Sequence, residues 1–345
     1  MTAAHAKRGW IGLHATAISR QPGRSIKAAA FGAAVLLAIP QGACGGEAAV
    51  RKPSSAERLN GEGVRRLERG DAKGAEETFR DALEEAALVD DLQGQAEAWN
   101  NLGALAMARG RPDEALSCHR TALHLHRARG ERDIGEIRSR ANAGSALLAL
   151  GRVADAEIEL EAAVALASAL GRGDAALLAQ VGLASVALHK KQPSRAAALA
   201  KVAAGAARGA GDFGTLAAAL AVEGAALDSL GDATSARARF EEALDIDRKR
   251  EAPFAVASDL RALSRLAERR GDLAAASSYL ARSARISRWM GDYERAEREL
   301  RRALSLAREV ASRDIELIES ELAELLRTRD TTGAEGSAPV AAPMK

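Results

Sequence analysis

The fold is decided by residues 99–130, WNNLGALAMARGRPDEALSCHRTALHLHRARG. Gly110 divides this stretch into two halves, and within each half apolar residues recur at spacings of three and four, as in amphipathic helices. Glycine ends a helix by adopting the left-handed backbone conformation, so Gly110 and Gly130 each mark a helix end. The stretch therefore predicts one pair of antiparallel helices.

The same arrangement returns along the chain about every 40 residues. The turn position is occupied in order by Gly70, Gly110, Gly151, Lys191, Gly231 and Gly271, and an alanine follows each turn, at Ala75, Ala115, Ala156, Ala196, Ala236 and Ala276. Half a period away lies a second set of breaks: Gly130, Gly171, Gly211, Glu251 and Gly291. A fixed period of this length indicates a solenoid, an architecture that usually serves to bind something.

We therefore predict an all-α solenoid of seven helical hairpins over residues 55–328, in which Asp, Ser or Thr after a break caps the next helix. The predicted helix pairs are 55–69 with 72–89, 93–109 with 112–129, 134–150 with 153–170, 174–190 with 193–209, 214–230 with 233–249, 254–270 with 273–289, and 293–310 with 314–328. Residues 329–345 have no periodicity and are rich in Gly, Pro and Ala, so they predict a disordered tail.

The composition supports helices and argues against a β architecture. Only 3% of the residues are aromatic, whereas 47% are apolar, and much of this is alanine. Strands are rich in β-branched and aromatic residues, which excludes the propeller, whose period is also about 40 residues. The formal net charge is +2, but residues 1–44 hold five basic side chains and no acidic one, so the rest has a small acidic excess. That part lacks the basic surplus that binds phosphates, and we expect no nucleic-acid partner.

The N-terminal segment has the layout of an export signal. A basic stretch precedes the apolar residues 28–39 (AAAFGAAVLLAI), and small residues follow up to Cys44. As a helix the apolar part would span about 18 Å, which is too short for a hydrocarbon core about 30 Å thick. A transmembrane anchor is therefore disfavoured. The polar residues 45–54 would form a tether to the folded body.

Residues 41–44, Gln-Gly-Ala-Cys, resemble the cleavage motif of bacterial lipoprotein signals. In those signals small residues precede a cysteine that becomes the lipidated first residue of the mature chain, which implies lipidation of Cys44. Gln41 departs from the pattern, which prefers leucine there. Ordinary signal cleavage near residues 46–48 and an uncleaved leader are the alternatives. Cys118 is the only other cysteine, so no disulfide framework is expected.

Several repeated positions resemble the tetratricopeptide repeat. The resemblance is carried by Trp99, Leu102, Gly103, Ala115 and Ala122 in one unit, by Gly63, Ala75, Phe79 and Ala82, by Gly144, Ala156 and Ala163, by Gly224, Ala236, Phe240 and Ala243, and by Tyr293, Ala296, Leu300 and Ala303. Small residues at these positions let helices approach closely. The resemblance implies a right-handed superhelix of the long-period subclass seen in kinesin light chains, because the period of about 40 exceeds the usual 34. HEAT-type repeats are the alternative fold.

Side chains for catalysis or metal binding are sparse, and we predict neither an enzyme, nor a metal site, nor a cofactor. Cys118, His119, His124 and His126 lie close together in sequence. However, no two of them have the three- or four-residue spacing that brings ligands to one helix face. We expect His119 to be packed and His124 and His126 to be solvated. No phosphate-binding glycine-rich loop and no nucleophile elbow is present.

In the resembled family the first helix of each hairpin lines a concave groove. This implies a set of partner-binding residues: Asn60, Asn100, Asn101, Arg138, Asn142, Arg261 and Arg265. Asn101 and Asn142 match positions at which long-period relatives hold a peptide backbone, and an amide can donate and accept hydrogen bonds together. Small and apolar residues follow in the middle units, and the C-terminal arginines suit an acidic group. The alternative is that the asparagines only bridge neighbouring first helices and that the arginines are solvated.

The sequence thus predicts a non-enzymatic scaffold of the bacterial cell envelope that binds a protein or peptide partner in its groove. It would be exported and held at a membrane by a lipid anchor on Cys44 rather than by a transmembrane helix. A soluble cytoplasmic module that binds a peptide or protein is the second hypothesis, and the location of the protein after cell fractionation distinguishes the two.

Overall fold

The computed structural model describes residues 53–130 and 132–335, with side chains up to residue 328. The predicted signal peptide at 1–44, the lipidation site Cys44, all but the end of the tether at 45–54, and residues 336–345 of the tail lie outside the described residues. Within the described ranges, no helix combines the length and the apolar character that crossing a membrane requires.

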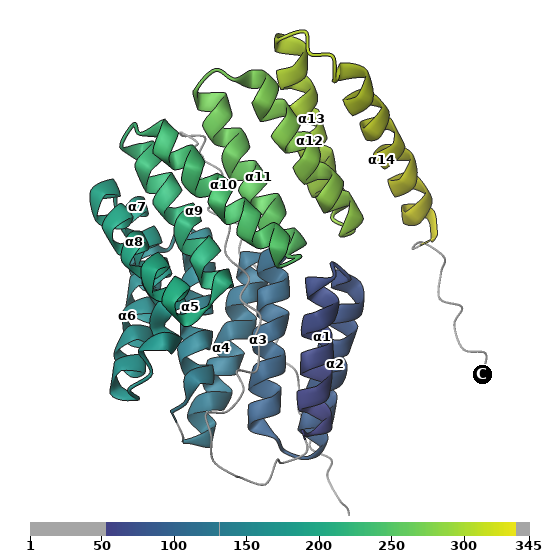
Figure 1. Cartoon of the computed structure of the whole chain (residues 1–345). Helices are drawn as coiled ribbons and strands as arrows, with labels where there is room; N and C mark the ends of the chain where they lie inside the picture. Colours follow the sequence, from purple (N-terminus) through teal and green to yellow (C-terminus); the bar gives the residue numbers. More distant parts are fainter. Residues whose placement is uncertain (1–52, 131, 336–345) are drawn as a thin grey trace, which may run out of the picture.

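In the described part of the chain, fourteen α-helices follow one another in consecutive packing pairs (Figure 1). The helices are α1 (Ser55–Glu68), α2 (Ala72–Leu88), α3 (Leu92–Ala108), α4 (Pro112–Arg129), α5 (Ile134–Ala149), α6 (Val153–Ala169), α7 (Leu177–His189), α8 (Pro193–Ala210), α9 (Phe213–Ser229), α10 (Ala233–Lys249), α11 (Pro253–Arg269), α12 (Leu273–Trp289), α13 (Tyr293–Glu309) and α14 (Ile315–Glu335). The predicted all-α solenoid of seven hairpins is confirmed.

Two helix boundaries differ from the prediction by more than one residue. The residues before α7 form a short 3-10 helix, Gly173–Ala176, because the side chain of Arg172 bonds to Asp174 instead of capping the helix. At the C-terminal end, α14 continues to Glu335, so the helix takes in the first seven residues of the segment that was predicted to be disordered.

Aspartates and left-handed turns set the helix ends. The carboxylates of seven aspartates accept a hydrogen bond from a backbone N–H in the first turn of a helix, as at Asp71 and Asp212: Asp71, Asp91, Asp133, Asp212, Asp232, Asp272 and Asp292. The predicted turn glycines have positive φ angles, as does Lys191 (φ 57°), which stands where the other units have glycine. Lysine therefore adopts the left-handed conformation that glycine takes in the other units.

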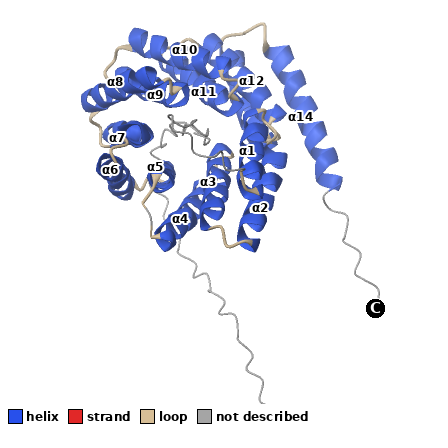
Figure 2. Ribbon diagram, turned by 60° about the horizontal axis from the view of Figure 1, so that its bottom comes forward, coloured by secondary structure: helices blue, strands red, loops and turns tan. Residues whose placement is uncertain are grey.

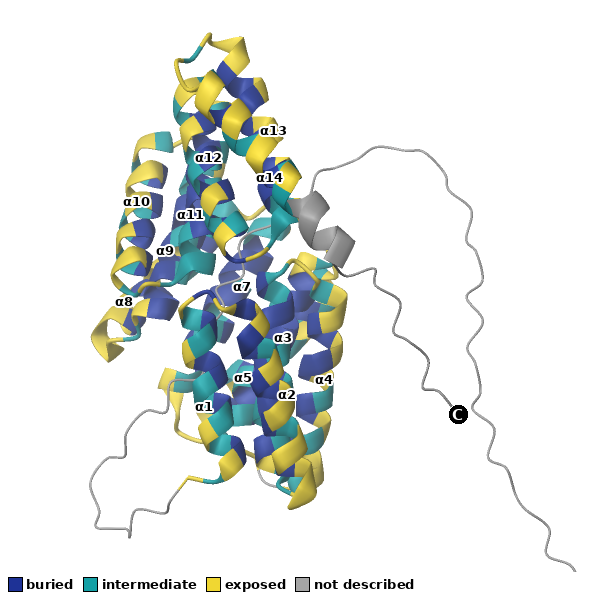
Figure 3. Cartoon of the chain, turned by 90° about the vertical axis from the view of Figure 1, so that its right-hand side faces the viewer, coloured by how far each residue is buried: buried dark blue, intermediate teal, exposed yellow. Residues whose placement is uncertain are grey.

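The two helices of each hairpin form separate layers of a curved array. Consecutive first helices contact one another, from α1 with α3 through to α9 with α11. Seen along the array, these helices lie on the inside of the curve and their partners lie outside (Figure 2). Figure 3 shows buried residues along α3, α7, α9 and α11 and exposed residues on the outward faces of α8 and α10. We call the inner surface formed by α1, α3, α5, α7, α9 and α11 the concave face.

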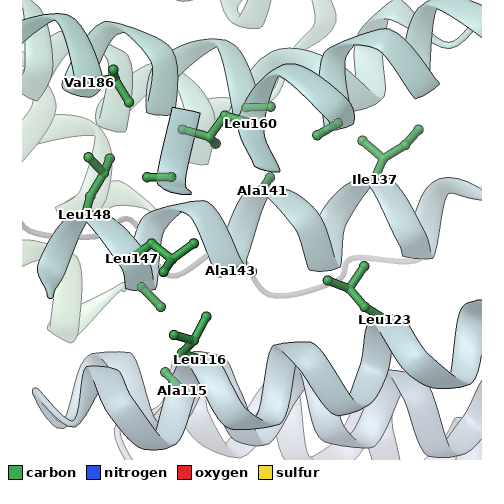
Figure 4. Close-up of a cluster of buried hydrophobic side chains, with 14 of the residues drawn as sticks. Ala115, Leu116, Leu123, Ile137, Ala141, Ala143, Leu147, Leu148, Leu160 and Val186 are labelled. Carbon is green, nitrogen blue, oxygen red and sulfur yellow. The ribbon is translucent and has the colours of Figure 1, made fainter. Parts of the chain in front are cut away.

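Glycines in the first helices make room for large side chains from their neighbours. Leu160 of α6 is fully buried, and a Cβ atom would lie only 2.6 Å from it at Gly144 of α5 and 2.5 Å from it at Gly182 of α7. Phe79 approaches Gly63 in the same way. Figure 4 shows Leu160 in the core cluster that joins these hairpins. The glycine positions of the repeat therefore set how closely the layers pack.

The array also contacts its own beginning. Phe254 of α11 packs against the cluster that contains Val64, Leu67 and Leu105 of the first two hairpins. The ring of Trp289 covers Gly70 in the α1–α2 turn. In Figure 1 the lower ends of α11 and α12 lie beside the upper ends of α3 and α1. We call these contacts, together with the hydrogen bond from Arg295 to Ala108, the closure contact.

Candidate functional site: the concave face

The open side of the inner helices defines which side chains a partner could reach. Helix α9 contacts α7, α8, α10 and α11, so only the side toward the inside of the curve stays open. The partly exposed residues on its middle turns are Ala218 and Ala221. On α7 they are Leu178, Gln180, Leu183, Leu188 and His189. The open side is therefore small and apolar on α9 and mixed on α7.

The four predicted asparagines come together near the N-terminal end of the array and bond to one another across helices. Asn101 Nδ2 donates to Asn60 Oδ1 at 3.2 Å, and Asn142 Nδ2 donates to Asn100 Oδ1 at 3.2 Å. Asn60 Nδ2 also donates to the carbonyl oxygen of Gly94 at 3.3 Å. All four asparagine side chains are buried. The asparagines thus link α1, α3 and α5, which is the bridging arrangement considered as the alternative from sequence.

These hydrogen bonds leave the side-chain carbonyl oxygens of Asn101 and Asn142 without a donor. The bonds shown involve one donor of Asn101 and one donor of Asn142. The carbonyl oxygens of these two amides accept no hydrogen bond from any described residue, and they are not among the fully buried unbonded atoms of the described chain. Each therefore retains an acceptor that a donor on a bound chain could use. Their role in partner binding stays a prediction.

Arg138 lies in a pocket of about 550 Å³ at the start of α5. The pocket is lined by Gln93, Glu97, His126, Asp133, Ile134, Gly135, Arg138, Leu170 and Arg172. The Arg138 Nε atom is buried and has no hydrogen-bond partner in the described structure. Burial lowers the pKa of Arg138, and the nearby carboxylates Glu97 and Asp133 act in the opposite direction.

Glu97, His126 and Asp133 were not identified from sequence as site residues. Burial would raise the pKa of Asp133, but His126, the backbone N–H of Glu136 and Arg129 together lower it. His126 Nδ1 lies 3.3 Å from Asp133 Oδ1. The expectation that His126 is solvated is wrong, because its ring packs against Gly135 at the join of α4 and α5. Glu97 and Arg138 lie one period apart, on neighbouring first helices, and this spacing could have indicated that their side chains lie close together.

The two C-terminal arginines differ in their partners. Arg261 Nη1 lies 3.3 Å from both Ser283 Oγ and Glu299 Oε1, and its pKa is lowered by burial. Arg265 makes no hydrogen bond or ion pair with the described residues. Burial, and then the charges of Arg261 and Arg269, lower the pKa of Arg265 to about 10. Solvation of both arginines, the alternative from sequence, therefore does not hold for Arg261.

The described residues bring no three His, Cys, Asp or Glu side chains together in a way that could hold a metal ion. His119 is packed as predicted, with Nδ1 2.8 Å from Asn100 Oδ1, and burial lowers its pKa to about 3. Cys118 is a buried free thiol whose pKa burial raises to about 11. His124 is exposed. Burial therefore keeps Cys118 in the thiol form, which is not the nucleophilic form of cysteine.

Comparison with known proteins supports the fold. A tetratricopeptide repeat family model matches residues 94–169. Among solved structures, NprR in complex with its cognate peptide NprX has a TM-score of 0.57 at 14% identity, with 84% of this chain and 83% of that chain covered. A Rap protein complexed with Competence and Sporulation Factor has a TM-score of 0.53 at 15% identity, covering 78% and 76%.

A third structure, a signal transduction ATPase of the STAND type with a tetratricopeptide repeat sensor from Pyrococcus horikoshii, has a TM-score of 0.52 at 16% identity. The match covers 81% of this chain and 42% of the ATPase chain. No curated protein sequence gives a significant match. At these identities the likeness shows the fold alone, which is a tetratricopeptide-repeat-like α-solenoid.

Proposed function

We propose that this protein is a non-enzymatic interaction scaffold that holds an extended segment of a protein or peptide partner on its concave face. The observation that carries the proposal is the concave face itself, whose inner helices carry the amide oxygens of Asn101 and Asn142, a pocket at Arg138 and, on α9, small apolar side chains. NprR and the Rap protein, which are similar in fold, are named as complexes with a peptide and with Competence and Sporulation Factor.

The asparagines would bind the backbone of the segment. The small apolar side chains of α9, Ala218 and Ala221, would contact its side chains. An extended segment presents backbone donors at regular intervals, and Asn101 and Asn142 offer amide acceptors on two neighbouring inner helices, α3 and α5. Because Asn101 and Asn142 are already bonded to Asn60 and Asn100, their positions are fixed before binding. Groups held in place before binding lose less conformational entropy when the partner arrives.

A pair of variants separates partner binding from bridging. Asn101→Ala removes the amide that would contact the partner, whereas Asn60→Ala removes only its bonded neighbour. We expect tagged full-length protein to lose its partner from a native envelope extract with Asn101→Ala plus Asn142→Ala and to retain it, at a reduced level, with Asn60→Ala. Circular dichroism would show that all variants fold. Equal loss of partner in both variants would mean that the asparagines act only as bridges.

The proposed location is the bacterial cell envelope, with the chain exported and held by lipid on Cys44. The support is the basic and apolar leader with its cysteine after two small residues. Stable anchoring needs more than one acyl chain, as a modified N-terminal cysteine could carry. Metabolic labelling with palmitate should mark the wild type and not Cys44→Ala. Label of equal intensity in both would contradict lipidation, and recovery of the full chain from the cytosol would favour a soluble regulatory module.

A further inference from the structure

The three arginines predicted for the concave face differ in how their charges are balanced. Arg138 has the carboxylates Glu97 and Asp133 beside it. Arg261 lies 3.3 Å from the carboxylate of Glu299. Arg265 forms no hydrogen bond or ion pair with a described residue, and the one carboxylate that acts on it is Asp228. Because Asp228 is ion-paired with Arg269, Arg265 is the only one of the three whose sole nearby carboxylate is paired with another described arginine.

The surroundings of Arg265 increase this imbalance. Its neighbours one turn away on α11 in either direction, Arg261 and Arg269, are also cationic and contribute to the lowering of its pKa. The carboxylate that acts in the opposite direction is Asp228 of α9, and it is already paired with Arg269. A partly buried guanidinium without a counter-ion is unfavourable for the folded chain on its own.

In most earlier units the residue equivalent to Arg265 is small. The equivalents are Ala104, Ser145, Ser185 and Ala225 in the second to fifth units, and Val64 in the first. On the neighbouring inner helix α9, Ala221 and Ala225 provide short side chains. A bound chain can therefore approach closely here, and the one long side chain at this position ends in a cation.

We propose that Arg265 is the anion-binding group of the concave face and takes a carboxylate of the bound segment, either an acidic side chain or the C-terminal carboxylate. The planar guanidinium donates two parallel N–H···O bonds to a carboxylate, and the partly buried setting strengthens such a pair. Arg261 is not part of this site, because its Nη1 group donates to Ser283 and to Glu299, and the Glu299 carboxylate balances its charge. The proposal rests on the proposed function and assigns the charge of its partner.

The first test is thermal stability, and it needs no partner. Removal of a structural arginine lowers the melting temperature, whereas removal of an uncompensated one does not. We expect Arg265→Met to melt at or above the wild-type temperature and Arg261→Met to melt about 2 °C or more below it, since the latter leaves Glu299 buried without its ion pair. A melting temperature of Arg265→Met several degrees below the wild type would overturn the proposal.

The second test observes binding directly. The arginine Nε–H signals of the full-length, ¹⁵N-labelled protein would be followed by NMR while a small carboxylate is added. N-acetylalanine imitates a chain end, the α-methylamide of N-acetylaspartate imitates an acidic side chain, and N-acetylalanine amide is the uncharged control. We expect the Arg265 signal, assigned by its loss in Arg265→Lys, to shift and saturate with at least one carboxylate and not with the amide.

The two carboxylates distinguish the sources of the anion, because the one that saturates at the lower concentration identifies which is bound. Equal, non-saturating shifts of Arg261 and Arg265 would overturn the proposal. The two proposals can fail separately. Pull-downs in which the Asn101 variant keeps its partner would contradict backbone binding by the asparagines. The Arg265 signals report on the anion site whether or not the asparagines bind the backbone.

Discussion

Arg295 donates a hydrogen bond of 3.0 Å through Nη1 to the backbone carbonyl oxygen of Ala108, although 187 positions separate the two residues. Ala108 ends α3, where carbonyl groups have no partner within the helix, and a cation at that end also interacts favourably with the helix dipole. Asp292 lies 3.2 Å from Arg295 and holds the guanidinium in place. The seventh hairpin is thus tied to the second.

We predict that loss of the closure contact opens the array without unfolding its hairpins. Replacing Phe254 and Arg295 together by alanine removes one of the two apolar parts and the polar part of the contact, and leaves Trp289 in place. The radius of gyration from small-angle X-ray scattering should increase, while the helical circular dichroism signal stays unchanged. Arg298→Ala is the matched control, since Arg298 is exposed and its nearest carboxylate is Glu294 at 3.8 Å. An unchanged radius in the double variant would show that neighbouring hairpins alone set the curvature.

Leu160 should be among the most costly side chains to truncate. It is fully buried between Gly144 and Gly182, so Leu160→Ala leaves a cavity that two glycine backbones cannot fill, at a cost of about 2–5 kcal/mol in unfolding free energy. Gly144→Ala alone should also destabilise, because its Cβ would meet Leu160 at 2.6 Å.

Combined, Leu160→Ala and Gly144→Ala should cost less than the sum of the two, since the new methyl group enters the space that leucine leaves. Chemical denaturation of the four proteins measures this coupling. Ile158→Ala, at a side chain that is 64% exposed, is the control and should change the unfolding free energy little. Strict additivity would contradict the packing described.

Asp259 should make stability fall as pH rises. Its pKa is raised well above the usual value by burial and by the neighbouring carboxylate of Asp247, and its Oδ2 atom is buried without a partner. Between the unfolded pKa near 4 and the higher folded pKa, the folded state holds more protons than the unfolded state, so the free energy of unfolding decreases with pH in that window.

Asp259→Asn removes this charge and keeps a donor for Asp247. At neutral pH we expect it to stabilise the protein by about 1 kcal/mol and to flatten the dependence of unfolding free energy on pH. Urea titrations at several pH values measure both effects. Asp245→Asn is the control, because Asp245 is exposed and paired with Lys249. A variant that is less stable than the wild type at neutral pH would show that Asp259 is ionised and stabilised in the fold.

Lys191→Gly should stabilise the fourth hairpin. Lys191 has a φ angle of 57°, in a region that costs an L-residue about 1–2 kcal/mol and glycine almost nothing. Greater flexibility of glycine in the unfolded chain offsets part of the gain, so we expect a net increase of about 1 kcal/mol in unfolding free energy. Gly231→Lys, at the same position one hairpin later, should have the opposite sign. Denaturant melts that move in the same direction for both would contradict the backbone argument.

The helices were predictable because each boundary is local. A capping aspartate such as Asp212 and a left-handed residue such as Gly211 act within a few positions, so period and residue type suffice to place them. The end of α14 was missed because sequence composition alone suggested disorder, although the preceding helix continues through it. The start of α7 shifted because Arg172 stands where other units place a capping aspartate.

The candidate site was predictable as a set of positions and not as a set of contacts. Repeat spacing correctly placed Asn101 and Asn142 on inner helices, and it also raised the possibility of bridging that their bonds show. Spacing could not reveal that Glu299 of the next hairpin neutralises Arg261 and leaves Arg265 unpaired. Such pairing depends on side-chain conformation across helices, which a single sequence does not encode in any short pattern.

The closure contact gives this chain a fixed circumference. In an open solenoid each hairpin touches only its neighbours, so a unit can be gained or lost at little cost to the others. Here an added hairpin between α6 and α7 would carry Phe254, Trp289 and Arg295 away from the turns at Gly70 and Gly110. The closure contact can therefore form only with this number of hairpins between its two sides, so it fixes the number of repeats.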